Sequence, residues 1–314
     1  MLATDVGGTR IKVALMCDRS VLGMECLEAR SREGLAPQLP RIQQVCEALC
    51  TRAGMGASDC AALGMAFPSV IDEASGRVAA AYGRYKDAQR LDLTVWARTT
   101  FGLRLLIEND ARMALLGEWQ MGAGRGSDNL AMLTLGTGLG TAALIQGRLL
   151  RGMHGQAGIL GGHFTVHQGG ATCTCGNRGC AEAEASTFAL PQAAHRHEFF
   201  AESALCDLQV IDYEAVMRLA CEGDRCAVAL RAQAIEIWSS LIVNLIHAYD
   251  PERVIVGGGL LAGAANFLSD LAEEVQRRAH TPWGRVTLVA AQLGDTAALF
   301  GCEALAETTL LGSS

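Results

Sequence analysis

The chain has 314 residues, which is long enough for two domains of ordinary size, and half of its residues are hydrophobic. Lysine and arginine total 26 against 33 acidic residues, and the resulting net charge of −7 lacks the positive potential on which nucleic-acid binding depends. Composition and charge therefore favour a globular protein with a large buried core and exclude nucleic acid as the expected partner.

Signals for export and membrane insertion are not expected. Asp5 precedes any apolar run that could serve as a signal peptide, and the apolar stretch 237–249 is interrupted by Asn244 and His247 and is shorter than a bilayer span. Of the 12 cysteines only three cluster, so we expect the others to be reduced thiols. The expectation is a cytoplasmic protein without a membrane partner.

Two segments far apart in the chain have the same pattern of strand, glycine turn and strand. Residues 2–16 alternate polar and apolar side chains after a turn at 5–9, and residues 129–150 repeat the pattern around a turn at 136–141. The repeat predicts two similarly built lobes, each opening with a hairpin whose turn faces a shared cleft.

Between the hairpins, two strands are expected to lead into polar residues. They are 61–67, ending at Pro68-Ser69, and 103–107, running into Glu108-Asn109-Asp110 and a helix at 111–120. Asn109 and Asp110 are favoured helix caps, and that interpretation stays open. Ligands in open α/β sheets bind at the carboxyl ends of strands, so a carboxylate there is also a candidate catalyst.

A short glycine-rich stretch contains His163, Cys173, Cys175 and Cys180. Three thiolates and one imidazole complete a tetrahedral zinc shell, and a closed shell holds a loop rather than activating water. The alternative is a disulfide, but Cys173 and Cys175 are too close to pair easily and a third cysteine would be left over. We predict a structural zinc site.

The last third of the chain is predicted to be a helix at 216–249, a buried strand entering a glycine turn at 253–261, a strand at 286–290 and a helix at 296–309. No low-complexity linker occurs, so short structured crossings are expected to join the lobes.

Three glycine turns, at 5–9, 136–141 and 257–259, could bring backbone amides close to phosphates. Each could also be only a tight connection. None has the spacing of a Walker loop or a dinucleotide fingerprint.

These motifs together resemble those of the ROK sugar kinases, over nearly the whole chain. Asp5 to Thr9 is similar to the first phosphate motif, 135–141 to the second, 256–259 to the adenosine motif, and Glu108-Asn109-Asp110 followed by Glu118 to the catalytic segment. Residues 173–182 match the Cys-x-Cys-Gly-x-x-Gly-Cys-x-Glu signature. The resemblance implies an α/β, two-lobed ribonuclease-H-like (actin/hexokinase) fold, with a nucleotide and sugar cleft between the lobes. The expected lobes are 1–112, with helix 296–314 packing back on it, and 113–295, with the zinc loop at 154–182.

The resemblance also implies the chemistry of an ATP-dependent kinase. Asp110 would be the catalytic base, Asp5 would orient Mg²⁺ through water, and zinc would be structural. The implied sugar-binding residues are Asn109, His163, Glu182 and Ser69. The implied ATP-binding residues are Asp5, Gly7, Gly8, Thr9, Lys12, Gly136, Thr137, Gly138, Gly257, Gly258 and Gly259.

The chain departs from the family at several sugar-site positions. Leu160 stands where relatives carry the glutamate of Glu-x-Gly-His, Ser69 replaces the glycine of Pro-Gly, and the usual Asn-Leu before a tryptophan is not evident in 82–96. A sugar hydroxyl facing Leu160 would lose a partner at a cost of about 1–3 kcal/mol. The charges of Tyr85-Lys86-Asp87 either rebuild the pocket or lie in a solvated loop. We expect a hexose or hexose derivative other than plain glucose.

Two other functions are consistent with a family of this kind. A ROK repressor carries a DNA-binding module, and the acidic balance together with a first phosphate motif at 5–9 leads us not to expect a repressor. A sensor that binds sugar or nucleotide without turnover is favoured by Leu160 but opposed by Asp5 and Asp110. Relatives imply a homo-oligomer, either dimer or tetramer. Residues 191–208, with His195 and His197, are predicted to be a surface loop without a metal.

Overall fold

The chain folds into two compact units. The computed structural model describes residues 1–72, 74–80, 84–259 and 267–311. Unit 1 comprises Met1–Gly126, Arg151–Ala157 and Asp295–Ser314, and unit 2 comprises Ser127–Leu150 and Gly158–Gly294. These bounds differ from the expected division at residue 112, because that position lies inside helix α3 (Asp110–Met121), which belongs wholly to unit 1.

Unit 1 is built on a five-stranded sheet in the order β3-β2-β1-β4-β7. The strands are β1 (Leu2–Val6), β2 (Arg10–Cys17), β3 (Ser20–Glu28), β4 (Leu63–Phe67) and β7 (Leu105–Asn109). β1 pairs antiparallel with β2, as the first predicted hairpin requires, and parallel with β4, which in turn pairs parallel with β7. A separate two-stranded sheet is formed by β5 (Val70–Asp72) and β6 (Arg77–Ala80).

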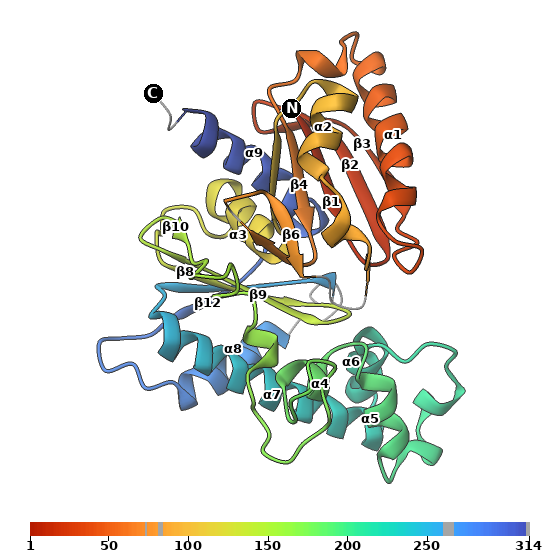
Figure 1. The fold of residues 1–314 in the computed structure, drawn as a ribbon. Helices are drawn as coiled ribbons and strands as arrows, with labels where there is room; N and C mark the ends of the chain where they lie inside the picture. The colour runs from red at the N-terminus through yellow and green to blue at the C-terminus, as the bar shows by residue number, and fades with distance from the viewer. Residues whose placement is uncertain (73, 81–83, 260–266, 312–314) are drawn as a thin grey trace. The chain divides into compact units, whose positions relative to one another are not determined.

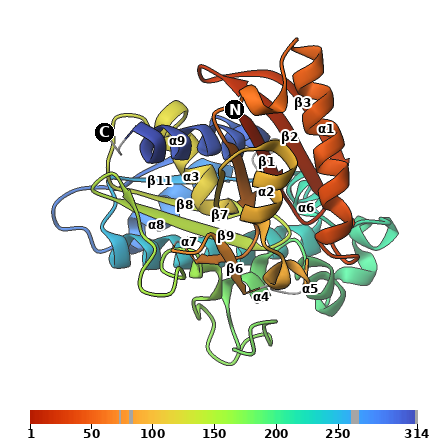
Figure 2. The ribbon, with the colours of Figure 1, turned by 45° about the horizontal axis from the view of Figure 1, so that its top comes forward.

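Side-chain alternation on β4 separates the two faces of this sheet. Leu63, Met65 and Phe67 join the core formed with α1 (Leu39–Arg52) and α2 (Leu93–Phe101). Gly64 points the other way, where an added Cβ would lie 2.5 Å from Cβ of Cys302 on α9 (Ala297–Leu311). Large residues therefore fill one face of the sheet, and small residues let α9 approach the other. Figure 2 shows α1 and α9 on opposite sides of this sheet.

Helices α3 and α9 pack with their backbones nearly in contact (Figure 1). An added Cβ on Gly117 of α3 would lie 2.0 Å from the Ala297 carbonyl oxygen, and one on Gly301 of α9 would lie 1.7 Å from the Met113 carbonyl oxygen. Glycine on both helices is what permits the approach. Through this contact α9, which lies near the C-terminus, packs on the N-terminal part of the chain and belongs to unit 1.

Unit 2 repeats the strand arrangement of unit 1 in the order β10-β9-β8-β11-β12. The strands are β8 (Leu130–Leu135), β9 (Leu139–Ile145), β10 (Arg148–Leu149), β11 (Arg253–Gly257) and β12 (Thr287–Ala290), and the helices are α4 (Ala181–Ala185), α5 (Leu190–Arg196), α6 (Tyr213–Cys221), α7 (Arg225–Tyr249) and α8 (Phe267–Arg278). As in unit 1, the first two strands of the unit are antiparallel and the next two pairings are parallel. The predicted repeat is confirmed, and the chain has the expected two-lobed α/β fold.

The core of unit 2 is centred on Trp238 of α7, whose ring centroid lies 4.8 Å from that of Tyr213 and 5.3 Å from that of Phe267. Its indole nitrogen donates to the Ala185 carbonyl at 3.0 Å. Among the described helices, α7 is long and apolar enough to cross a membrane. Half of its most apolar stretch is, however, buried in this core.

Two predictions for unit 2 are wrong, and a third is confirmed. The helix predicted at 216–249 is two helices, because Gly223 adopts φ +86° between them. The loop predicted at 191–208 is largely helical, with His195 in α5 and turns of 3₁₀ helix beyond it. The buried strand predicted to enter a glycine turn within 253–261 is confirmed, because β11 ends at Gly257 where the glycines begin; positions 260 and 261 lie outside the described residues.

Candidate active site

The sheet of unit 1 brings three predicted site segments to one edge. Asp5 on β1 is paired with Ala66 on β4, and Ala66 is paired with Glu108 on β7. Because these strands are parallel, the residues that follow them, including Ser69 and Asp110, leave the sheet at the same carboxyl edge.

Asp5 is a nearly buried carboxylate held by one cation. Lys12 Nζ lies 3.1 Å from Asp5 Oδ2 and also donates to the Asp295 carbonyl at 2.7 Å. Burial raises the pKa of Asp5, while the charge of Lys12 acts in the opposite direction. The lysine predicted to bind nucleotide is therefore also the partner of the acid predicted to orient magnesium.

Asp110 is the first residue of α3, and its pKa is raised to about 7. Burial of the carboxyl group is the main cause and the negative charge of Asp5 is the second. Hydrogen bonds from backbone amides, including that of Ala111 at 2.8 Å, partly offset the rise. A carboxylate with a pKa near neutrality is suited to accept a proton from a hydroxyl group.

Asn109 is the N-cap of α3. Its side-chain oxygen accepts from the amides of Ala111 at 3.0 Å and Arg112 at 3.2 Å, and its side-chain nitrogen donates to the Ser69 carbonyl at 3.1 Å. The cap interpretation is thus correct for Asn109, whereas Asp110 is left to face the edge. Ser69 Oγ is buried and has no hydrogen-bond partner among the described residues. A ligand hydroxyl would satisfy it.

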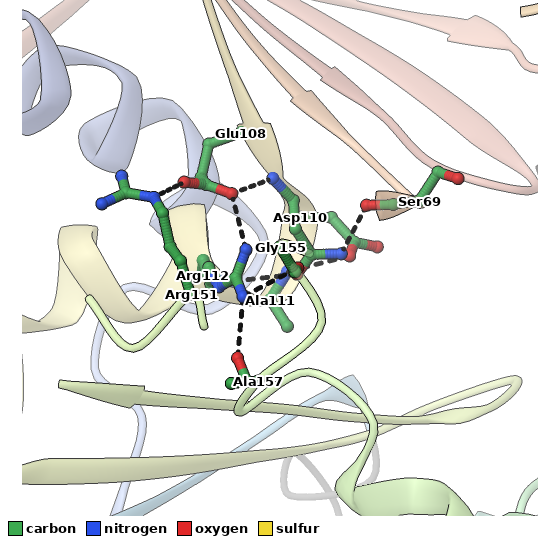
Figure 3. A network of polar contacts seen from close by, with 9 residues as sticks. Ser69, Glu108, Asp110, Ala111, Arg112, Arg151, Gly155 and Ala157 are labelled. Atoms are coloured by element: carbon green, nitrogen blue, oxygen red, sulfur yellow. Dashed lines mark hydrogen bonds and ion pairs between the residues drawn. The ribbon is translucent and has the colours of Figure 1, made fainter. Parts of the chain in front are cut away.

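A buried ionic network supports the first turn of α3 (Figure 3). Glu108 accepts from Arg112 Nη1 at 3.2 Å and from Arg151 Nε at 2.8 Å. Arg112, which is fully buried, also donates to the carbonyls of Gly155 at 3.0 Å and Ala157 at 2.7 Å. The network ties 151–157 to the helix that carries Asp110. Sequence reasoning did not single out Arg112 or Arg151, because the partners are about forty residues apart.

In the glycine turn after β1, the backbone carbonyls accept hydrogen bonds, whereas two of the amides donate none among the described residues. The carbonyls of Gly7, Gly8 and Thr9 accept from Tyr85 Oη, Ser31 Oγ and the Ala29 amide. No acceptor contacts the Gly8 and Thr9 amides within the part of the chain that the structure describes. A turn with free donors is an anion-binding site.

The residues Tyr85-Lys86-Asp87 have separate structural roles. Tyr85 is buried, and its hydroxyl donates to the Gly7 carbonyl at 2.8 Å. Asp87 accepts from the amides of Leu35 and Ala36 at 2.7 and 2.8 Å, and Lys86 is exposed. Only Lys86 thus fits the solvated-loop interpretation.

The glycine turn after β8 in unit 2 has the same arrangement, with its backbone carbonyls hydrogen-bonded. The carbonyls of Gly136, Thr137 and Gly138 accept from the Thr187, Phe188 and Gly136 amides respectively. Glu182 Oε2 accepts from the Leu139 amide at 3.0 Å. Within the described residues, the Thr137 and Gly138 amides have no acceptor.

The third glycine turn begins where β11 ends. Gly258 has φ +105°, and a Cβ there would lie 2.0 Å from the Leu135 carbonyl oxygen, so this position requires glycine. Among the described residues, no heavy atom lies within 4 Å of the Cβ position of Gly259. The turn therefore offers open space beside the end of β8.

The four predicted zinc ligands converge in unit 2. Their donor atoms all lie within 4.8 Å of one another. Cys175 and Cys180 Sγ are 3.7 Å apart, and Cys173 Sγ lies 3.5 Å from His163 Nδ1. A tetrahedral zinc shell requires sulfur–sulfur separations of about 3.8 Å and sulfur–nitrogen separations of about 3.5 Å. The donor set and spacing fit zinc, and none of the cysteines is in a disulfide.

Two other predicted positions have clear places. Leu160 directly precedes the 3₁₀ turn 161–163 that carries His163. Glu118 lies at the opposite end of α3 from Asp110, fully buried, and its carboxylate accepts from the Ala123 amide at 2.8 Å, which is a helix-end contact.

Comparisons with known proteins show which proteins this chain is similar to. The family model described as "ROK family" matches residues 1–309. Glucokinase of Thermotoga maritima is 28% identical over 319 residues, covering 99% of this chain and 98% of that protein. A ROK-family glucokinase from Streptomyces griseus, solved in complex with glucose and AMPPNP, is 28% identical with a TM-score of 0.79 and covers 96% of this chain and 97% of that one. The xylose repressor of Bacillus subtilis is 26% identical over 77% of this chain and 60% of its own length.

Proposed function

The chain belongs to the ROK family, and from this premise we propose that it is an ATP-dependent kinase that phosphorylates a hydroxyl of a hexose or hexose derivative. The glucokinase relatives support a sugar as the acceptor and ATP as the phosphoryl donor.

The observation that carries the proposal is the state of Asp110. A buried carboxylate with a pKa of about 7, at the edge where Asp5 also lies, is poised to take the proton of an acceptor hydroxyl. The hydroxyl oxygen then forms a bond to the γ-phosphorus, the bond from that phosphorus to the leaving oxygen breaks, and ADP departs.

The free amides of Gly8, Thr9, Thr137 and Gly138 would bind phosphate oxygens, and the 257–259 turn would lie along the adenosine. Asp5 keeps one carboxylate oxygen that no described side chain contacts, so it could hold a hydrated magnesium ion. When bound, that ion would neutralise phosphate charge. Lys12 would hold Asp5 in place.

Zinc would be structural. The segment that ends in Cys180 leads directly into α4, and Glu182 on this helix binds the Leu139 amide. His163, Cys173, Cys175 and Cys180 would hold the ion with no open coordination position, so it would fix the loop without activating water.

The acceptor is proposed to contact Asn109, Ser69, His163 and Glu182. The unsatisfied Ser69 hydroxyl favours a polar group next to it, whereas Leu160 supplies no acceptor where relatives have an acid. A hexose with an altered substituent at the Leu160 side fits both features better than glucose.

The test is coupled ATP consumption across a panel of hexoses, amino sugars, deoxy sugars and their epimers. We expect turnover with at least one derivative at a higher kcat/KM than with glucose. Leu160→Glu should raise glucose phosphorylation relative to the preferred sugar, while Val210→Glu, an exposed apolar position, should not. No ATP consumption with any sugar would contradict the kinase proposal.

Leu160 and the repressor relatives also favour a second candidate, a sugar or nucleotide sensor without turnover. It predicts saturable sugar binding in calorimetry with no ADP formed, and the same panel separates it from the kinase.

A further inference from the structure

One guanidinium group lies against the glycine turn of unit 1 and has no part in the function proposed above. An ideal Cβ on Gly8 would lie 1.5 Å from Arg84 Nη1 and 2.4 Å from Arg84 Cζ. The guanidinium therefore occupies the space that any side chain at position 8 would fill. Glycine at position 8 therefore leaves room for the Arg84 guanidinium in addition to forming the turn.

The Arg84 side chain is available for a ligand. It is exposed, and among the residues that the structure describes it forms no ion pair and no hydrogen bond. By contrast, Arg10 and Lys12, which follow this turn on β2, are engaged, since Arg10 pairs with Asp295 at 3.0 Å and Lys12 pairs with Asp5. Arg84 is thus a cation without a described ion-pair partner that lies against Gly8.

The next residue anchors Arg84 to this place. The buried ring of Tyr85 packs on Phe67 with ring centroids 5.6 Å apart, and its hydroxyl is bonded to the Gly7 carbonyl. Burial raises the pKa of Tyr85 to about 12, while the positive charge of Arg84 lowers it and the negative charge of Asp5 raises it. A cation fixed by a buried neighbour loses less entropy when it binds an anion.

We propose that Arg84 is a further catalytic residue, which binds the phosphoryl group during its transfer from ATP. The inference rests on the proposed kinase function. The free amides of this turn can donate to a phosphate, and a guanidinium against the same turn can donate two further hydrogen bonds to the equatorial oxygens of the phosphate. Charge spread over those oxygens is what phosphoryl-transfer enzymes stabilise, frequently with an arginine.

The other source of an anion is the acceptor, if the sugar carries a carboxylate or phosphate. The two sources make different predictions. If a residue binds the transferred phosphoryl group, its removal weakens binding of nucleotides that carry a γ-phosphate but not of ADP. Its removal also lowers kcat with every acceptor. A residue that binds an anionic acceptor affects only the KM of that acceptor.

The experiment compares the full-length wild type with Arg84→Ala, Arg84→Lys and the control Arg104→Ala, another exposed arginine of unit 1. Calorimetry measures binding of AMPPNP and of ADP, and steady-state kinetics measure kcat and KM for the best sugar. We expect Arg84→Ala to lower kcat roughly 10²- to 10³-fold. It should also weaken AMPPNP binding about tenfold with ADP binding unchanged, and Arg84→Lys should restore part of both.

Equal weakening of AMPPNP and ADP, or a change confined to the acceptor KM, would overturn the proposal. The binding comparison needs no turnover. If the wild type phosphorylates no sugar, the kinase function fails, while a selective loss of AMPPNP binding in Arg84→Ala still supports a γ-phosphate contact.

Discussion

Glu182 accepts a hydrogen bond from the Leu139 amide at 3.0 Å, and it stands two residues after Cys180 in the chain. The cysteine cluster is therefore linked, through the first turn of α4, to the glycine turn that leads into β9. Loss of a metal from the cluster can therefore act through Glu182 on the Thr137 and Gly138 amides, which are proposed to bind phosphate.

Zinc removal is expected to abolish activity through this route. Cys175→Ser should lower bound zinc well below one equivalent, as measured by elemental analysis, and reduce nucleotide and sugar binding together. Cys206→Ser, an exposed cysteine outside the cluster, should retain both. Full activity in a zinc-free protein would contradict the structural role.

Activity should rise with pH through the pKa of Asp110. The base must be ionised, and its pKa is about 7, so kcat/KM is expected to fall about tenfold for each unit below that value. Asp5→Asn removes a charge that raises this pKa and should move the Asp110 titration to lower pH, measured by carboxyl-carbon NMR. Asp18→Asn, an exposed turn residue, is the control. An unmoved titration in Asp5→Asn would show that the two acids are not coupled.

The free energy of unfolding should also depend on pH through Asp110, but it should fall as pH rises, whereas activity should increase. The folded-state pKa of about 7 exceeds the unfolded value of 3.8, so the folded protein binds more protons between these limits and loses stability as pH rises through them. Asp110→Asn should therefore be more stable than the wild type at pH 8, by about 1–3 kcal/mol, and no more stable at pH 4. Chemical denaturation at both pH values measures this, and a stabilisation that does not depend on pH would contradict the assignment.

The contact between α3 and α9 should tolerate no side chain. Gly301→Ala places a methyl group against the Met113 carbonyl and should cost at least about 2–3 kcal/mol of unfolding free energy. Thr308→Ala, on the exposed side of α9, should change it by less than about 0.5 kcal/mol. Equal stabilities for the two variants in denaturant titrations would disprove the close approach.

Ser69 should matter for the acceptor and not for folding. Its buried hydroxyl has no partner among the described residues, so Ser69→Ala should leave stability unchanged or improved while raising the sugar KM roughly tenfold. Ser239 is a matched control, because its hydroxyl is also buried without a partner but lies in the core of unit 2. An unchanged KM in Ser69→Ala would remove this residue from the sugar site.

Local patterns in the sequence predicted the elements whose causes are local. Alternation around glycine turns indicated both hairpins, and ligand spacing over 163–180 indicated the metal cluster. The strand at 20–28 was not predicted, because as an edge strand it exposes most of one face and lacks a continuous apolar run.

Features that depend on distant residues were not predictable. The environment of Arg112 requires the carbonyls of Gly155 and Ala157, and the raised pKa of Asp110 depends on its burial and on the charge of Asp5, which lies on another strand. Arg84 carries no sequence signal of its own, because what distinguishes it is its contact with Gly8, about eighty residues away in the chain.

The measurement that tests the central claim most directly is the turnover of Asp110→Asn with the best sugar from the panel, alongside its binding of AMPPNP and of the sugar. The account predicts that kcat falls by roughly 10²–10⁴-fold while both dissociation constants stay within a few-fold of the wild type. A variant that turns over at the wild-type rate would contradict the assignment of Asp110 as the base.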